Sequence, residues 1–271
     1  MQTRPLGRTG LDVSVLSLGG VAFGDMYGNL APGEADACVR RAVELGVNFI
    51  DTSPYYGRTR SESVLGEILQ GGLREKIYLC SKAGRDGLDE FDFSPRHIEE
   101  SVNASLKRLR TDYLDVLIAH DIEFADDFEK VFTETAEALH RLKAAGKCRF
   151  VGMSGYPLGI LVRAIERCDL DVVISYCHFT LQNTALRTRL LPVAERHGVG
   201  VLNASPLAMG LLTPGGPPEW HPAPPGIKQA ARRAAELCQR HGTDLAFVGM
   251  QFAFSEPRIA STITGAARAS E

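Results

Sequence analysis

Short apolar runs rich in Val, Ile and Leu recur along the chain and are separated by longer stretches of helical period. The runs cover residues 13–18, 47–50, 77–80, 116–119, 150–153, 172–174, 199–202 and 259–263. One stretch between them begins with Ser94 and Pro95, a pair typical of a helix start. Its apolar residues then share one helix face: Ile98, Val102, Leu106 and Leu109. Strands that alternate with helices predict a parallel sheet covered by helices.

Other residues mark the expected helix ends. Thr59 and Glu62 have the spacing of a capping box, which predicts a helix that starts there and runs to Leu69. Glycine follows several of the apolar-periodic segments, where a helix often ends in a left-handed residue. These glycines are Gly46, Gly146, Gly198 and Gly242. The Pro- and Gly-rich stretch 214–226 is the one long irregular segment, and we expect a functional loop after the seventh strand.

Eight strands favour a closed (β/α)8 barrel, the TIM barrel, over an open doubly wound sheet. After the first run the chain reads GGVAFG at 19–24, which does not match the G-x-G-x-x-G of a Rossmann sheet. No boundary divides the chain, so we expect one barrel domain over 1–271. Only residues 264–271 follow the eighth run, so we expect the final helix to be missing or truncated.

Polar residues directly follow most of the apolar runs. They are Asp51, Ser81, Lys82, His120, Asp121, Ser154, Ser175, Asn203 and Ser205. In a parallel barrel the carboxyl ends of the strands meet at one mouth, so these side chains are expected to converge there. A single Asp after a strand is commonly a turn or cap residue, whereas a lysine is rarely buried without a partner. Spacing alone therefore predicts a barrel enzyme whose chemistry is open.

Composition narrows the class of protein. The 271 residues are 44% apolar and 23% charged, enough for a large core, and the net charge is −3. This near balance argues against a nucleic-acid-binding protein. No apolar run reaches the length of about 18 residues needed to span a membrane, so we expect a cytoplasmic protein without membrane contact. The six cysteines form no C-x-x-C pair, which predicts free thiols and no metal site.

Tyr56 gives the mouth a specific chemistry. A tyrosine phenol has an ordinary pKa of about 10, which suits the oxygen of an alcohol or carbonyl but is high for work at pH 7. The Lys82 ammonium, within about 4–6 Å, would lower that pKa by favouring the phenolate. Asp51 would hold Lys82 charged, and His120 would hydrogen-bond the substrate oxygen. This set fits proton transfer coupled to hydride transfer.

With these residues in this order, the sequence resembles the aldo-keto reductases over nearly its whole length, from LGRTGL at 6–11 to ITG at 263–265. The resemblance implies a (β/α)8 barrel that binds a nicotinamide dinucleotide across the strand ends. It implies the catalytic residues Asp51, Tyr56, Lys82 and His120. It also implies cofactor contacts from Gly20, Asp51, Ser154, Ser175, Ser205, Leu207, Gly210 and Gly265. Gly155 stands where Asn is usual in the family, and Ser175 where Gln is common.

Five segments resemble the L-galactose dehydrogenase branch of this family: 51–57, 120–124, 175–178, 204–212 and 216–222. The branch implies oxidation of C1 of L-galactose or L-fucose to a lactone, with NAD preferred and NADP open. It lacks the tyrosine that stacks under the nicotinamide elsewhere; Ala204 stands there, and Tyr176 is our candidate for the missing ring. The expected substrate contacts are Tyr55, His120, Trp220 and His221, although loop packing explains Trp220 equally well.

Other functions remain open at this point. One is a broad NADPH-dependent carbonyl reductase of the same fold, and another is a non-catalytic nicotinamide-binding barrel like the potassium-channel β-subunits. An aldolase that forms a Schiff base on Lys82 is disfavoured because Asp51 would keep the amine charged. A serine hydrolase is least favoured, because GMSGY at 152–156 misses the G-x-S-x-G motif by one position. The expected partner is a small sugar or carbonyl, bound by a monomer or weak homodimer.

Overall fold

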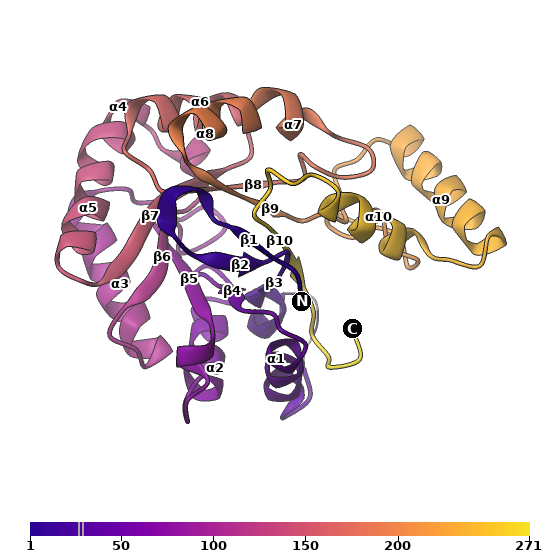
Figure 1. Ribbon diagram of the computed structural model, residues 1–271, viewed down its shortest axis with the longest axis horizontal. Coiled ribbons are helices and arrows are strands. Elements are labelled where there is room, and N and C mark those ends of the chain that lie inside the picture. The colour runs from indigo at the N-terminus through magenta and orange to yellow at the C-terminus, as the bar shows by residue number, and fades with distance from the viewer. Residues whose placement is uncertain (27, 29) are drawn as a thin grey trace.

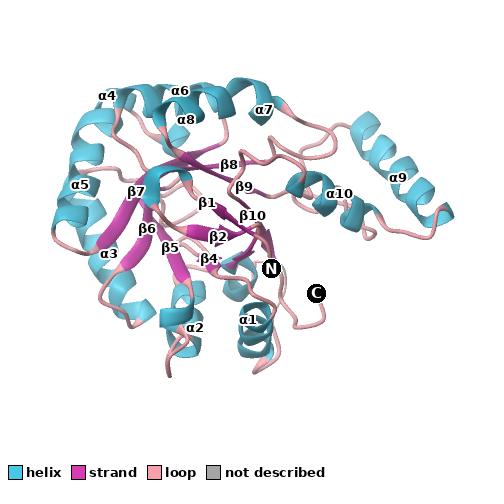
Figure 2. Ribbon diagram, in the orientation of Figure 1, coloured by secondary structure: helices cyan, strands magenta, loops and turns pink. Residues whose placement is uncertain are grey.

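Eight parallel strands form a closed barrel in the computed structural model, which describes residues 1–26, 28 and 30–271. The strands follow the order β10-β3-β4-β5-β6-β7-β8-β9 around the barrel. They are β3 (Leu16–Gly19), β4 (Phe49–Asp51), β5 (Tyr78–Ala83), β6 (Leu114–Ala119), β7 (Cys148–Gly155), β8 (Val172–Tyr176), β9 (Gly200–Ala204) and β10 (Ser261–Gly265). Figure 2 shows them at the centre of a ring of helices. The predicted (β/α)8 barrel is confirmed.

The first predicted strand is divided into two elements. Residues 13–18 separate into β2 (Asp12–Ser14), which pairs antiparallel with β1 (Thr3–Pro5), and β3 of the barrel. The amide of Ser14 donates to the side-chain oxygen of Asn48 at 2.7 Å, and the chain bends at Val15 before β3 begins. The β1–β2 hairpin closes the amino-terminal end of the barrel, where Val13 packs among the interior residues. The prediction of one continuous strand was therefore wrong.

Helices cover the outside of the barrel. They are α1 (Glu34–Glu44), α2 (Arg60–Ile68), α3 (Pro95–Leu109), α4 (Phe128–Lys130), α5 (Ala136–Ala144), α6 (Leu158–Arg167), α7 (Ala185–Arg189), α8 (Leu191–His197), α9 (Pro225–Arg240) and α10 (Leu245–Phe254). A π-helical turn over Val131–Thr135 joins α4 to α5, and short 3₁₀ turns cover Gly7–Thr9, Gly20–Gly24, Arg74–Lys76 and Ile122–Phe124. Figure 1 shows α9 projecting away from the barrel. None of the helices in the described part of the chain is both long and apolar enough to cross a membrane.

The helix ends agree only in part with the sequence signals. Ser94 caps α3 as predicted, because its hydroxyl oxygen accepts the amide hydrogen of His97. The capping box at α2 is wrong: Thr59 has a left-handed backbone, with φ of 75°, and its side chain makes no cap hydrogen bond. Glu62 instead points inward and accepts hydrogen bonds from Ser81 and Arg108 at 2.6 and 2.7 Å. The predicted left-handed glycines are present, with φ between 68° and 90°.

The loop after β9 is longer than predicted and is packed rather than loose. It covers residues 205–224, and α9 starts at Pro225, inside the predicted irregular stretch. Ala208, Leu211 and Leu212 of the loop form a small apolar core with several residues of α9, including Ala231, and with Leu245 of α10. This cluster is separate from the layer between barrel and helices, so the loop and the two helices pack as a unit beside the mouth.

No helix forms in residues 266–271, which follow β10 as turns and irregular chain. Ala266 packs against apolar residues of the outer layer, and its carbonyl accepts a weak hydrogen bond from the Cys38 thiol at 3.6 Å. Beside it, an apolar hollow of about 120 Å³ lies over Leu16, Leu18 and Val47.

Candidate active site

Three neighbouring strands bring the predicted catalytic residues together. Asp51 ends β4, Lys82 lies near the end of β5, and His120 directly follows β6. Parallel pairing of β4 with β5 and of β5 with β6 places these positions side by side at the carboxyl end of the barrel. Tyr56 reaches the same place from the loop after β4. The Tyr56 oxygen and the Lys82 nitrogen are 3.2 Å apart.

Lys82 is buried, and every proton of its ammonium group has an acceptor. Its Nζ donates to both carboxylate oxygens of Asp51 at 2.6 and 2.7 Å, to the Thr52 carbonyl at 2.8 Å and to the Tyr56 oxygen at 3.2 Å. Burial by itself would lower the pKa of Lys82, but the surrounding groups, among which Asp51 contributes most, together raise the pKa above its usual value. Lys82 is therefore a fixed cation beside the phenol.

The protonation of Tyr56 differs from the expectation. Burial raises the pKa of the Tyr56 phenol well above its usual value, and the Lys82 ammonium offsets only part of that rise. Lys82 lowers this pKa as predicted, but the expectation that the pKa would fall below its usual value was wrong, because burial has the larger effect. Sequence spacing identified the cation next to the phenol but not the desolvation, which comes from the packing of the whole mouth. The site contains a protonated phenol that receives a hydrogen bond from an ammonium.

His120 is neutral. Burial lowers its pKa to about 3, although the nearby Asp121 carboxylate opposes this effect. Its ring stands edge-on to the Tyr56 ring, with 5.9 Å between the ring centroids. Its Nδ1 lies 3.0 Å from the hydroxyl oxygen of Ser53, and its Nε2 lies 3.6 Å from a carboxylate oxygen of Asp121. His120 can therefore exchange a hydrogen bond with a substrate but carries no charge near pH 7.

A second buried ion pair lies beside these four residues and was missed by the sequence analysis. Nη1 of Arg85 is 2.5 Å from a carboxylate oxygen of Asp121, and the guanidinium stacks 3.8 Å above the centre of the Tyr55 ring. Burial would raise the pKa of Asp121, but His120 and Arg85 together lower it. Asp121 also has a left-handed backbone, with φ of 54°, a strained conformation for this residue type that often occurs at functional sites.

The signal that revealed Lys82 and His120 was also available for this pair. Asp121 follows the fourth apolar run immediately after His120, and Arg85 lies three residues after Lys82, just beyond β5. The apolar run predicts a strand that ends at Cys80, five residues before Arg85. Because β5 continues to Ala83, Arg85 lies at the mouth.

A groove of about 620 Å³ starts at Asp51 and Tyr56 and continues past the loop after β9 to the last residues of the chain. Of the predicted cofactor contacts, it is lined by Asp51, Ser205, Leu207, Gly210 and Gly265. Ala204 also lines it. These residues come from the ends of β4, β9 and β10 and from the loop after β9, so the groove crosses the mouth of the barrel.

Three predicted cofactor residues lie behind the groove wall. Gly20 is buried, its carbonyl accepts from the Ser61 hydroxyl at 2.7 Å, and its neighbours Gly19 and Val21 line the groove instead. The Ser154 hydroxyl oxygen accepts the amide hydrogen of Asp121 at 2.9 Å. Ser175 is fully buried, with its hydroxyl 3.4 Å from Nδ1 of His178.

The aromatic residues predicted to contact cofactor or substrate lie in different places in the fold. Tyr55 lies at the mouth, 6.0 Å from the His120 ring between centroids. Tyr176 donates its hydroxyl hydrogen to Glu123 at 3.1 Å and does not line the groove, so the structure gives no support to its proposed place under a nicotinamide ring. The Trp220 side chain lies outside the groove lining and is 62% exposed.

Both ring nitrogens of His221 are occupied within its own loop. Nε2 lies 2.9 Å from the Ala208 carbonyl oxygen, and Nδ1 accepts the amide hydrogen of Ala223 at 3.1 Å. The side chain is buried, so these bonds fold the loop back on itself. In this arrangement both nitrogens of His221 face their own loop, and its contact with a substrate stays a prediction.

The loop after β9 has an unusual backbone. Ser205, Ala208 and Met209 have φ of 53°, 50° and 52°, and Gly210 follows with 93°. Non-glycine residues adopt such left-handed conformations at a cost, and these conformations often occur at functional sites. Ser205, Met209 and Gly210 line one part of the groove, and Arg268 lines another.

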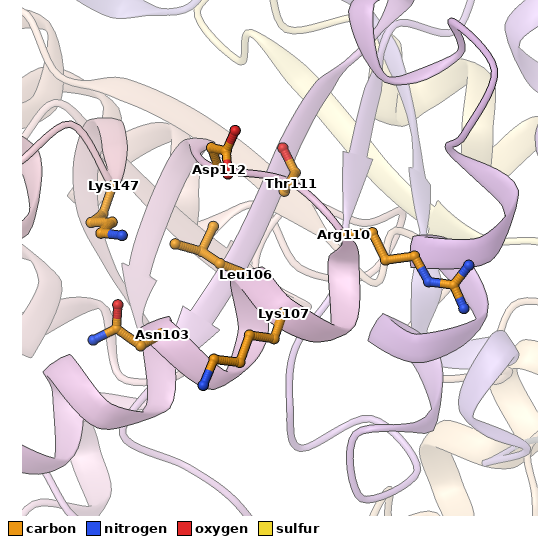
Figure 3. Close-up of a pocket in the computed structure, with 7 residues that line it drawn as sticks. All are labelled: Asn103, Leu106, Lys107, Arg110, Thr111, Asp112 and Lys147. Carbon is orange, nitrogen blue, oxygen red and sulfur yellow. The ribbon is translucent and has the colours of Figure 1, made fainter.

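A second hollow of about 610 Å³ lies at the carboxyl end of α3, where basic side chains extend from the surface (Figure 3). Its lining residues are Asn103, Leu106, Lys107, Arg110, Thr111, Asp112 and Lys147. They precede β6 and β7, and the hollow is therefore at the opposite end of the barrel from Tyr56. Barrel enzymes carry their chemistry at the carboxyl ends of the strands, so we assign the site to the groove.

Comparison with known proteins identifies the family. A profile of the Aldo/keto reductase family matches residues 15–271. The chain belongs to this family. It is 42% identical, over its full length and 86% of the other protein, to the L-galactose dehydrogenase of Arabidopsis thaliana. It is 36% identical to the D-arabinose 1-dehydrogenase of Saccharomyces cerevisiae, over 90% of this chain and 76% of that protein.

A solved structure shares the fold and the family. The holo form of an aldo-keto reductase from Bacillus halodurans resembles the chain with a TM-score of 0.84 and 25% identity, over 100% of this chain and 88% of that one. Aldo-keto reductases use nicotinamide cofactors. The present chain, as a member of this family, is an oxidoreductase. The predicted family, barrel and enzyme class are confirmed.

Proposed function

We propose that this aldo-keto reductase is an aldose 1-dehydrogenase that oxidises the C1 hydroxyl of an L-sugar of the galactose or fucose type to its lactone. The observation that carries the proposal is the hydrogen-bonded chain from Asp51 through Lys82 to Tyr56, with 3.2 Å between the last two. The similarity to an L-galactose dehydrogenase and a D-arabinose 1-dehydrogenase supports a sugar substrate with a hydroxyl at C1.

Each of the four residues has its own role in the proposed proton transfer. The dinucleotide, when bound, supplies the hydride acceptor and a positive charge near the phenol. For sugar oxidation the Tyr56 phenol would first release its own proton to solvent, and the Lys82 ammonium would stabilise the resulting phenolate. That phenolate would then take the proton of the C1 hydroxyl as the C1–H hydride is transferred. Asp51 keeps Lys82 charged and in place. His120 orients the C1 oxygen by a hydrogen bond.

The groove is the proposed binding site of the dinucleotide, and the choice between NAD and NADP is a further part of the proposal. Ser205, Leu207 and Gly210 would contact the diphosphate region, and Gly265 and Arg268 the more distant part. We propose NAD as the preferred cofactor, as the similarity to the L-galactose dehydrogenase branch implies. All six cysteines are free, which fits a reducing compartment such as the cytoplasm.

On the substrate side, Arg85, Asp121 and Tyr55 are the proposed contacts to the sugar hydroxyls. A carboxylate accepts hydrogen bonds from hydroxyl groups, and a guanidinium donates to hydroxyl oxygens, so a fixed pair of them can recognise neighbouring positions of a sugar ring. The pair lies next to His120, at 3.6 Å from Nε2 to Asp121. These residues replace Trp220 and His221 of the sequence prediction.

The test is reduction of NAD and of NADP by L-galactose, L-fucose and D-arabinose, with a plain aldehyde assayed in the reverse direction. We expect turnover of at least one L-sugar with NAD. Absence of turnover with every sugar would defeat the proposal. One observation favours a second candidate, a carbonyl reductase: the raised pKa of Tyr56 makes the phenol a ready proton donor to a carbonyl oxygen. Fast aldehyde reduction with NADPH and no sugar oxidation would select that function.

A further inference from the structure

Ser53 makes a buried contact that no step of the proposed reaction has used. It lies in the loop between Asp51 and Tyr56 and is completely buried. Its hydroxyl oxygen is 3.0 Å from Nδ1 of His120 and accepts the amide hydrogen of Tyr55 at 3.1 Å. The hydroxyl is thus held between a backbone donor and the ring that faces the substrate.

Counting hydrogens decides the direction of the bond to His120. The Tyr55 amide occupies an acceptor site on the Ser53 oxygen. If Nδ1 carried the ring proton, it would donate to the same oxygen, and the Ser53 hydroxyl hydrogen would then find no acceptor among the described residues. An unpaired donor in a dry site costs about 1–3 kcal/mol. If Nδ1 is unprotonated, the hydroxyl donates to it and the Ser53 hydrogen is paired.

The other side of the ring leads to the same answer independently. Nε2 of His120 faces a carboxylate oxygen of Asp121 at 3.6 Å, too far for a hydrogen bond but close enough for electrostatics to act. Arg85 holds Asp121 as a carboxylate at 2.5 Å. A proton on Nε2 faces this negative charge favourably, whereas a bare nitrogen lone pair in that position would be repelled.

We propose that Ser53 is a positioning residue that fixes His120 as the tautomer with its proton on Nε2. In that form Nε2 of His120 donates a hydrogen bond to the C1 oxygen. Nε2 then has no free lone pair that could accept the proton of the C1 hydroxyl. The proton of the sugar hydroxyl is therefore directed to Tyr56 alone. This inference deepens the proposed dehydrogenase function and rests on it for its kinetic consequence, while the tautomer itself does not depend on the substrate.

Nitrogen-15 NMR of the full chain, recorded with and without NAD⁺, reads the tautomer directly. The chain has seven histidines, and the His120 signals are those lost in a His120→Asn variant. We expect a protonated Nε2 and an unprotonated Nδ1 in the wild type, and a mixture of tautomers in Ser53→Ala. The matched control is Ser14→Ala: Ser14 is also fully buried and also donates and accepts, to Leu16 and from Asn48, but at the closed end of the barrel. It should leave the His120 signals unchanged.

Kinetics gives the second measurement. Ser53→Ala should lower kcat/KM for the sugar about tenfold, the effect of losing one oriented hydrogen bond, with the dissociation constant of NAD⁺ unchanged. Ser53→Thr restores the hydroxyl and should restore both the spectrum and the rate. A wild-type ring protonated at Nδ1, or an unchanged spectrum in Ser53→Ala, would overturn the inference. A wild type without sugar turnover but with the expected spectra would instead refute the proposed function and leave the tautomer assignment standing.

Discussion

The Nζ of Lys82 lies 3.2 Å from the phenol oxygen of Tyr56, although the two residues come from different strand–helix units. The ammonium acts as donor in this contact, so the hydroxyl hydrogen of Tyr56 is left to point away from Lys82. Burial and the cation act on the phenol in opposite directions, and burial is the larger effect. The predictions below follow from this contact and from the groups that surround it.

Tyr56→Phe removes the proton acceptor while keeping the ring that packs against His120. We expect kcat for sugar oxidation to fall about 10²- to 10⁴-fold, the usual contribution of a positioned acid–base group. The circular dichroism spectrum and the affinity for NAD⁺ should stay as in the wild type. Unchanged turnover would show that Tyr56 is not the acid–base group.

Lys82→Met leaves the Asp51 carboxylate buried without its cation. Removal of one partner of a buried ion pair costs about 3–5 kcal/mol, so the free energy of unfolding in urea should fall by that amount at pH 7. Asp51→Asn combined with Lys82→Met removes both charges and should be more stable than Lys82→Met alone. A double variant that is less stable than the single one would contradict the ion-pair argument.

His120 makes the fold sensitive to acid. Burial lowers its pKa to about 3 in the folded protein, whereas the usual value, which applies to the unfolded chain, is about 6.5. Between these values the unfolded state binds more protons, so stability falls as the pH falls through this window, by at most about 1.4 kcal/mol per pH unit. His120→Asn should lose less stability than the wild type between pH 6.5 and 4 in urea titrations. Equal losses would show that His120 titrates normally.

Arg85→Met tests the proposed sugar contact. We expect kcat/KM for L-galactose or L-fucose to fall about 10- to 100-fold, because a charged hydrogen-bond donor is lost, with a smaller loss for a plain aldehyde that has no further hydroxyls. An equal loss for both substrates would place the effect on His120 rather than on sugar recognition.

Arg74→Met is the matched control for that variant. The side chain of Arg74 is about as buried as that of Arg85, 11% against 12% exposed, and it is paired with Asp115 at 2.9 Å. This pair lies before β5 and at the start of β6, at the other end of the barrel. Arg74→Met should lower stability without changing the ratio of sugar to aldehyde activity. A changed ratio would mean that the assay responds to stability alone.

The sequence by itself determined the barrel and the four central residues of the site. Apolar runs separated by helical periods specify parallel strands, and parallel strands bring their carboxyl ends to one face. Asp51, Lys82 and His120 stand at those ends, so their convergence followed from position along the chain. The α3 start at Ser94 was equally readable, because its cap is a contact over three residues.

Tertiary structure decided what depends on contacts between distant segments. Three features each depend on a partner that is not adjacent in sequence. They are the strain and pairing of Asp121 with Arg85, the hydrogen bonds of both His221 nitrogens within its loop, and the inward orientation of Glu62. The pKa of Tyr56 depends on how completely the packing of the mouth removes water from around the phenol. Spacing shows which charge lies near the phenol, but desolvation is a property of the whole packed site, and here it is the stronger of the two.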